Sequence, residues 1–168
     1  MAARILFVVV AVLSFAIDRV TKLLVQEELQ PGEHVRVFGE WLQLRYVENR
    51  GIAFGLFSDL GLVVVFGTLV VGGLLLFFML HVEPEDLLTV AGGALITGGA
   101  FGNLVDRVQY RYVIDFIQLP RWPTFNVADI AITLGVIAVL AAQVVAMRAE
   151  SRAARLESDA ATRGEDPS

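Results

Sequence analysis

The chain has 168 residues, of which 56% are hydrophobic and only 18% are charged, a composition far too apolar for an ordinary soluble domain. The formal net charge of −5 argues against a nucleic-acid partner, which needs a basic face. The sequence has no cysteine, which excludes disulfides, thiolate nucleophiles and cysteine-bound metals, and a membrane protein is the first prediction.

Long uncharged runs predict membrane-spanning helices, because a bilayer core of roughly 30 Å needs about 20 apolar residues in a helix. Three such runs are Leu60–Leu80, Leu87–Val105 and Ile130–Met147. A shorter run, Ile5–Ile17, reaches spanning length only by continuing through Asp18, Arg19 and Lys22. We predict an α-helical membrane protein with a single membrane-embedded domain, residues 1–150. Its four spans are expected at about 4–25, 60–81, 87–107 and 127–148.

The first span has an alternative interpretation as a secretory signal peptide. Arg4 precedes an apolar stretch, and "SFA" at 14–16 resembles a small-x-small cleavage site. In that case the mature chain begins near Ile17 and three spans remain.

Two loops, 26–59 and 108–126, lie on the same side of the membrane if there are four spans. Alternating apolar residues in the first loop predict two short strands around a turn at Gly39. These residues are Val35, Val37, Leu42, Leu44 and Tyr46. In the second loop "YVIDFIQL" predicts a strand and "PRWP" predicts its end.

The tail, 151–168, alternates charged residues with alanine and ends in "TRGEDPS", which predicts disorder. Arginines occur in the loops as well as near both termini, so the positive-inside rule hardly fixes the orientation. We favour cytoplasmic termini, which makes this a cytoplasmic tail.

The third span is rich in small residues. Ala94, Gly98 and Gly102 recur every four residues and line one helix face, which predicts close approach of another helix.

Polar residues gather at the ends of two spans. Asn103, Asp106 and Arg107 share one face of the third span, and Asp18 and Lys22 share one face of the first. Ionisable groups at this depth are costly and tend to pair or to face a polar interior. Structural ion pairs, interfacial snorkelling and a functional site all explain this pattern.

Several hydrolytic centres are disfavoured. The two histidines, His34 and His81, are separated by the predicted topology, so a Ser-His-Asp triad lacks support, and no HExxH motif is present. Ser14 lies about 12 Å along the helix from Lys22, too far for a Ser–Lys dyad. Spacing does not exclude Ser58 as the serine of a Ser–Lys dyad, but no other feature of the sequence supports this role.

Two carboxylates remain as candidates for an aspartic-protease pair, in which one activates water and the other holds a proton. Asn126 predicts an N-cap with Asp129 at the third helical position, where the helix macrodipole favours negative charge. Apolar neighbours such as Val113 and Phe116 favour the neutral form of Asp115. We therefore interpret Asp129 as the base and Asp115 as the proton carrier, in a pair that titrates as a unit. On these residues alone, a proton or ion pathway has equal weight.

Five motifs in one order resemble the lipoprotein signal peptidases (signal peptidase II), aspartic proteases of the bacterial inner membrane. They are "DRVTK" at 18–22, "ENRGIAFG" at 48–55, "GGAFGNLVDRV" at 98–108, "VIDFI" at 113–117 and "FNVAD" at 125–129. The resemblance covers nearly the whole chain apart from the tail.

The resemblance implies four transmembrane helices with a small extracytoplasmic β-sheet over the active site. It implies removal of the signal peptide from a diacylglyceryl-modified prolipoprotein, with cleavage before the lipidated cysteine by Asp115 and Asp129. Substrate-binding or site-supporting residues are then Asp18, Lys22, Asn49, Gly51, Ala53, Asn103, Asp106, Arg107 and Asn126. We expect a monomer in contact with membrane lipid, with no cofactor or metal, and inhibition by cyclic peptides such as globomycin.

Two features depart from the family pattern. Arg111 stands where the family usually has glycine, and only 14 positions separate the two aspartates. We also hypothesise that Gly98 and Gly102 leave room for the signal-peptide helix. The alternatives are a transporter with a relay of acids and a structural protein whose acids pair with arginines.

Overall fold

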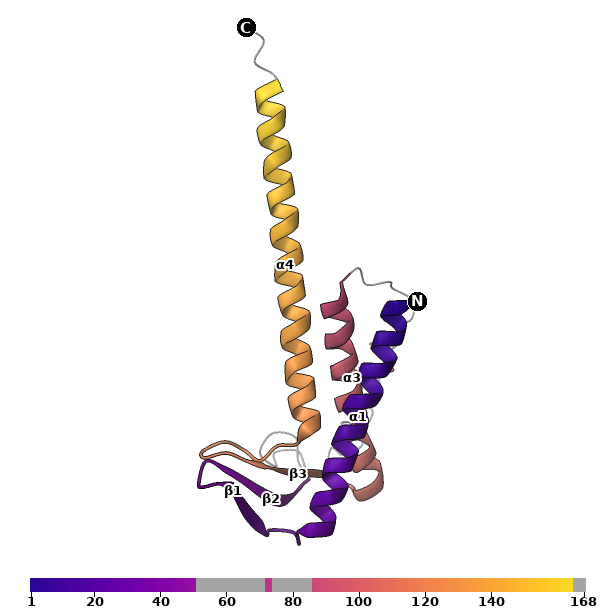
Figure 1. Ribbon diagram of the computed structural model, residues 1–168, viewed down its shortest axis with the longest axis vertical. Coiled ribbons are helices and arrows are strands. Elements are labelled where there is room, and N and C mark those ends of the chain that lie inside the picture. Colours follow the sequence, from indigo (N-terminus) through magenta and orange to yellow (C-terminus); the bar gives the residue numbers. More distant parts are fainter. Residues whose placement is uncertain (51–71, 74–85, 165–168) are drawn as a thin grey trace.

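The computed structural model describes residues 1–50, 72–73 and 86–164, which form long helices beside a small sheet (Figure 1). The helices are α1 (Ala2–Glu28), α3 (Leu87–Tyr110) and α4 (Val127–Gly164). The strands are β1 (His34–Phe38), β2 (Leu42–Asn49) and β3 (Val113–Gln118). Three predicted spans thus coincide with helices, whereas the predicted span at 60–81 lies outside the described residues apart from Gly72 and Gly73.

Helix α3 packs against both α1 and α4, which touch each other little. Two adjacent glycines, Gly98 and Gly99, allow α3 to pack closely against both helices, because one faces α1 and the other faces α4. A Cβ atom on Gly98 would clash with the carbonyl oxygen of Ala11 in α1, and one on Gly99 would lie 2.6 Å from that of Ala128 in α4. Such close backbone approach is typical of helix packing in membranes.

The face of α3 formed by Ala94, Gly98 and Gly102 meets α1, so the predicted close approach of a helix is confirmed. Gly102 abuts the carboxylate of Asp18, and Ala94 is fully buried beside Phe7. The hypothesis that Gly98 and Gly102 leave room for a signal-peptide helix is wrong, because α1 already fills that space.

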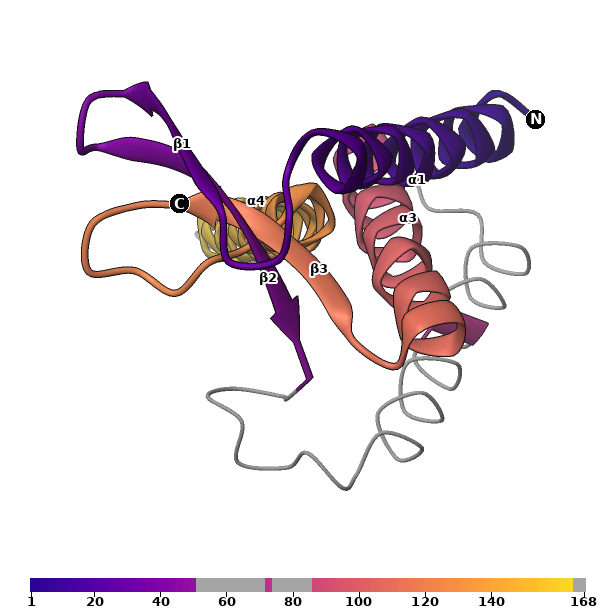
Figure 2. The ribbon, with the colours of Figure 1, turned by 90° about the horizontal axis from the view of Figure 1, so that it is seen from below.

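The sheet is antiparallel, with strand order β1-β2-β3, and the predicted strand pair and third strand are present. Gly39 makes the β1–β2 turn with a φ of +56°, a conformation that suits glycine. β1 is exposed throughout, whereas the first four residues of β3 are buried. A core of Val25, Leu29, Tyr46, Ile114 and Phe116 joins the sheet to the end of α1. The sheet therefore lies across one end of the helices (Figures 1 and 2).

Helix α4 has 38 residues and includes 151–164, which we expected to lie in a disordered tail. The residues after Met147 are mostly alanine, arginine, glutamate and serine, and alanine, arginine and glutamate have high helix propensity. At about 1.5 Å per residue the helix is about 57 Å long, far more than a bilayer core of roughly 30 Å. The helix is therefore longer than a membrane crossing needs, and Figure 1 shows α4 extending far past the ends of α1 and α3.

Apolar side chains cover the outer surfaces of the helices. Among the described residues, α3 and residues Val127–Leu156 of α4 are long and apolar enough to cross a membrane. Only 11% of the apolar window in α4 is buried inside the protein. α1 exposes a similar apolar surface that includes Ile5, Val12 and Val20. Exposed apolar faces of this extent suit contact with lipid.

Candidate active site

Most of the predicted site residues that the structure describes converge where α1, α3, β3 and the start of α4 meet, at the sheet end of the helices. Asp18, Lys22, Asn103, Asp106, Asp115 and Asn126 are all buried, with at most 6% of each exposed. Asp129 and Arg107 are half-buried, and Asn49 is exposed. Gly51 and Ala53 lie outside the described residues.

Asp115 is 2% exposed, although it is a carboxyl group in a strand flanked by apolar residues. Its Oδ2 accepts a hydrogen bond from Asn49 Nδ2 at 2.8 Å, and its Oδ1 accepts one from Asn126 Nδ2 at 2.7 Å. Burial raises the pKa of Asp115 to about 7, and the charge of Asp129 adds to the rise, while both amides and Lys22 oppose it. Asp115 is thus a carboxyl group that can carry a proton near neutral pH.

Asp129 lies in the first turn of α4, where it takes part in a reciprocal cap. Asn126 Oδ1 accepts the backbone N–H of Asp129 at 3.0 Å, and Asp129 Oδ2 accepts the N–H of Asn126 at 3.2 Å. The predicted N-cap at Asn126 is therefore confirmed, with Asp129 in the acidic position of a capping box. This position stabilises negative charge near the helix N-terminus.

Two asparagine side chains link the aspartates. Asn126 bonds Asp115 through Nδ2 and the backbone of Asp129 through Oδ1. Asn103 donates from Nδ2 to Asp129 Oδ1 at 3.0 Å, and its Oδ1 accepts from Asn126 Nδ2 at 3.0 Å. The two carboxyl groups therefore share one network of neutral amides.

Behind this network lies a buried ionic cluster around Lys22, which is completely inaccessible to solvent. Its Nζ lies 2.9 Å from Asp18 Oδ2, 2.8 Å from Asp106 Oδ2 and 2.9 Å from Asn103 Oδ1. Arg19 also pairs with Asp106. The cluster thus contains two acids and two cations, and its charges balance, as buried charges require.

Both acids of this cluster also bind the backbone. Asp106 Oδ2 accepts the N–H of Ile114 at 3.1 Å, and Asp18 Oδ1 accepts the N–H of Ala128 at 2.9 Å. Ile114 immediately precedes Asp115, and Ala128 immediately precedes Asp129. Each cluster acid therefore holds the chain one residue before one of the paired aspartates.

Two arginines lie at the site, and the sequence predicted only one of them, Arg107, as a site residue. Arg19 was missed as a site residue, although it stands inside the "DRVTK" motif, because helical spacing from Asp18 points to Lys22 rather than to its neighbour. Arg107 donates to the backbone carbonyl oxygen of Asn103 at 3.2 Å.

Within the described part of the chain, no group of three or more histidine, aspartate or glutamate residues could hold a metal ion.

The comparisons with known proteins agree with one another. The profile of the family described as signal peptidase (SPase) II matches residues 10–145. The chain belongs to the signal peptidase II family. Membership makes it an aspartic-type signal peptidase, a membrane hydrolase in lipoprotein processing.

Individual relatives and solved structures fit this family. The lipoprotein signal peptidase of Moorella thermoacetica is 41% identical over 131 residues, 78% of this chain and 87% of that protein. The lipoprotein signal peptidase of Caldanaerobacter subterraneus subsp. tengcongensis is 43% identical over 131 residues, which are 77% of this chain and 89% of that protein. A solved structure described as a bacterial membrane enzyme superposes with a TM-score of 0.77 at 28% identity, covering 82% of this chain and 87% of that one.

Proposed function

We propose that Asp115 and Asp129 form the catalytic pair of an intramembrane endopeptidase that removes the signal peptide from diacylglyceryl-modified prolipoproteins. Cleavage occurs before the lipidated cysteine. The observation that carries the proposal is the shared amide network, in which Asn126 binds the carboxyl group of Asp115 and the backbone of Asp129. An aspartic-type peptidase needs two such neighbouring carboxyl groups.

In this mechanism Asp129 is the base and Asp115 is the acid. Ionised Asp129 takes a proton from water, whose oxygen attacks the scissile carbonyl carbon while protonated Asp115 donates a hydrogen bond to the carbonyl oxygen. The carbon–nitrogen bond then breaks, and a proton from the pair passes to the leaving amine. A pKa of Asp115 near 7 supports this order of roles. We expect kcat to fall as the pH rises above about 7 and Asp115 ionises.

The membrane arrangement is part of the proposal. Four transmembrane helices place the sheet and the pair at the extracytoplasmic surface of the bacterial inner membrane, with both termini in the cytoplasm. In support, α1 begins and α4 ends at the end of the molecule opposite the sheet (Figure 1). The first half of α1 packs through Phe7 against Val90 and Ala94, which favours a permanent span over a cleaved signal peptide. We further propose a monomer that is inhibited by globomycin.

The alternatives account for less of the geometry. In a proton relay the acids would line a path open to solvent, but Asp18 and Asp106 are fully buried in ion pairs with Lys22 and Arg19. In a structural protein the acids would pair with cations, but Asp115 is bound by amides.

The test is cleavage of a lipid-modified prolipoprotein by the purified protein in lipid or detergent, followed as release of the signal peptide. We expect Asp115→Asn and Asp129→Asn each to abolish cleavage. Asp86→Asn is the matched control, because Asp86 caps the far end of α3 and asparagine caps a helix equally well. Full activity of either site variant contradicts the proposed pair.

A further inference from the structure

The buried Lys22 connects to both proposed catalytic aspartates through separate chains of contacts. One chain runs through Asp106 to the N–H of Ile114, before Asp115. Another runs through Asp18 to the N–H of Ala128, before Asp129.

A third chain passes through Asn103 and fixes the orientation of its amide. Lys22 Nζ and Asn126 Nδ2 both donate to Asn103 Oδ1, at 2.9 and 3.0 Å. The opposite end of the amide, Nδ2, must then face Asp129, to which it donates at 3.0 Å. Without Lys22, Asn103 Oδ1 loses one of its two hydrogen-bond donors, and the orientation of the amide is held less firmly.

Lys22 lies out of reach of substrate. An ammonium group has three N–H donors and no acceptor, and three oxygens surround Nζ at 2.8 to 2.9 Å. The side chain is 0% exposed. A role in binding substrate directly is therefore excluded by its surroundings.

We propose that Lys22 is the positioning residue that sets the separation and orientation of the catalytic pair, a proposal that rests on the proposed function above. Asp18 and Asp106 are its two arms, and each holds the backbone beside one aspartate. Because Lys22 binds both arms, a shift of β3 relative to the start of α4 breaks a contact in the cluster.

The single variant Lys22→Met leaves two buried acids with one cation, which is strongly destabilising. The informative variant is Lys22→Met with Asp18→Asn, because the remaining pair of Asp106 and Arg19 is again neutral. The new amide oxygen can still accept the N–H of Ala128. Thr21→Val is a matched control on the same helix, since Thr21 bonds to backbone oxygens of α1 and to no other group among the described residues.

We expect the double variant to remain folded, with kcat lowered on the order of 100-fold, as for a misplacement of about 1 Å, and KM changed little. A fall in kcat without a change in KM is the readout that a purely structural role does not predict. Thr21→Val should keep normal kinetics. Wild-type kcat, a change in KM that accounts for the whole loss of activity, or a double variant that fails to fold each overturns the proposal. If Asp115→Asn and Asp129→Asn retain activity, the proposed function itself fails, whatever Lys22 does.

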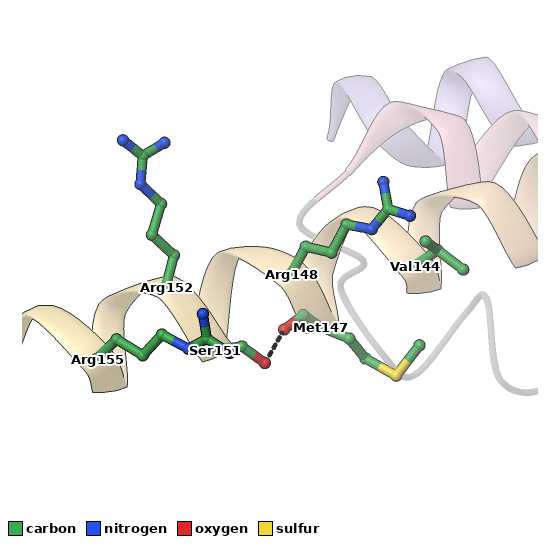
Figure 3. A pocket seen from close by; sticks show the side chains of 6 residues that line it. All are labelled: Val144, Met147, Arg148, Ser151, Arg152 and Arg155. Atoms are coloured by element: carbon green, nitrogen blue, oxygen red, sulfur yellow. Dashed lines mark hydrogen bonds between the residues drawn. The ribbon is translucent and has the colours of Figure 1, made fainter.

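A second, independent feature lies at the opposite end of α4, just beyond its apolar run. Arg148, Arg152 and Arg155 line an open pocket together with Val144, Met147 and Ser151 (Figure 3). Spacings of four and three residues place the arginines on one helix face. Residues 148–155 contain three arginines and one acid, Glu150, whereas 156–168 contain four acids and one arginine. Positive charge is thus concentrated next to the apolar run.

The depth of these arginines matches the lipid headgroups. If Val127 marks one edge of a bilayer core of roughly 30 Å, the other edge falls about 20 residues later, near Met147. Arg148 then lies at the boundary, and Arg155 lies about 10 Å beyond Arg148 along the helix. Arginine binds phosphate oxygens through charge-assisted, bidentate hydrogen bonds.

We infer that this arginine face binds the phosphate groups of anionic phospholipids in the leaflet opposite the proposed active site. Because the chain has no cysteine, Ala154→Cys allows one fluorophore to be placed beside the face. The labelled protein is reconstituted in phosphatidylcholine vesicles with and without phosphatidylglycerol that carries a headgroup quencher.

We expect quenching to show enrichment of phosphatidylglycerol that weakens with salt and falls about 5-fold for each arginine replaced by glutamine, as about 1 kcal/mol per residue implies. Arg148→Gln with Arg152→Gln is compared with Arg36→Gln with Arg45→Gln, two exposed arginines of the sheet. Equal enrichment in both double variants, or none in the labelled wild type, refutes the inference.

Discussion

The buried carboxyl group of Asp115 makes a quantitative prediction, because its pKa links the proposed proton carrier to the stability of the fold. Burial raises this pKa from an ordinary value of 3.8 to about 7. The native state therefore binds the proton more tightly than the unfolded chain does. The stabilisation from this proton is complete below pH 3.8 and is lost as the pH rises through about 7.

The magnitude follows from the size of the rise. At about 1.4 kcal/mol for each tenfold change in acidity, the rise corresponds to a loss of about 4 kcal/mol between pH 4 and pH 8. Solvent screening reduces this little, because Asp115 is only 2% exposed. Asp115→Asn removes the titrating group, so the variant should gain stability relative to wild type by about this amount over the same interval.

The measurement is the free energy of unfolding of both proteins in detergent micelles at several pH values. Asp86→Asn is the control, because hydrogen bonds from Thr89 lower the pKa of Asp86, and its difference from wild type should be flat above pH 5. The reasoning is refuted if the free energies of unfolding of Asp115→Asn and wild type differ by an amount that stays constant within about 1 kcal/mol from pH 5 to pH 8.

Three further predictions concern packing, backbone conformation and the amide network. Gly99→Ala places a Cβ 2.6 Å from the carbonyl oxygen of Ala128 and should destabilise the fold by about 1–3 kcal/mol, whereas Gly73→Ala, with nothing within 4 Å, should not lower the Tm. Arg111 ends α3 with a φ of +68°, so Arg111→Gly should leave the Tm unchanged or raise it, while Arg111→Val should lower it. Asn126→Ala removes both the cap and the bridge to Asp115, and it should lower stability by about 1 kcal/mol. Asn126→Ser should restore the cap and the Tm but not the cleavage rate. If the cleavage rate recovers together with the Tm, the amide group of Asn126 is not needed for catalysis.

Local features of the site could be predicted from the sequence. Asn126 and Asp129 are three residues apart, so the cap that they form depends only on the start of α4. The end of α3 also has a local reason to favour glycine, since the chain adopts a left-handed conformation at Arg111. Such features need no knowledge of which elements pack together.

Contacts between distant elements could not be predicted in this way. Asn49 reaches Asp115 because β2 and β3 pair in a register with an irregularity between Leu44 and Val47, which alternation does not reveal. Helical spacing likewise placed Gly98 and Gly102 on one face, but it did not show that α1 covers that face. Side-chain bonds to the backbone of Ile114 and Ala128 have no sequence signature at all.

The order of charges in the site explains how a carboxyl group can stay protonated beside buried cations. The side-chain oxygens of Asp115 accept hydrogen bonds from neutral amides, while Lys22 and Arg19 bind the acids Asp18 and Asp106. A cation bonded directly to Asp115 would favour its ionised form and lower its pKa. Because Lys22 and Arg19 are matched by Asp18 and Asp106, these two cations hold the backbone in place while the hydrogen-bond partners of Asp115 stay neutral.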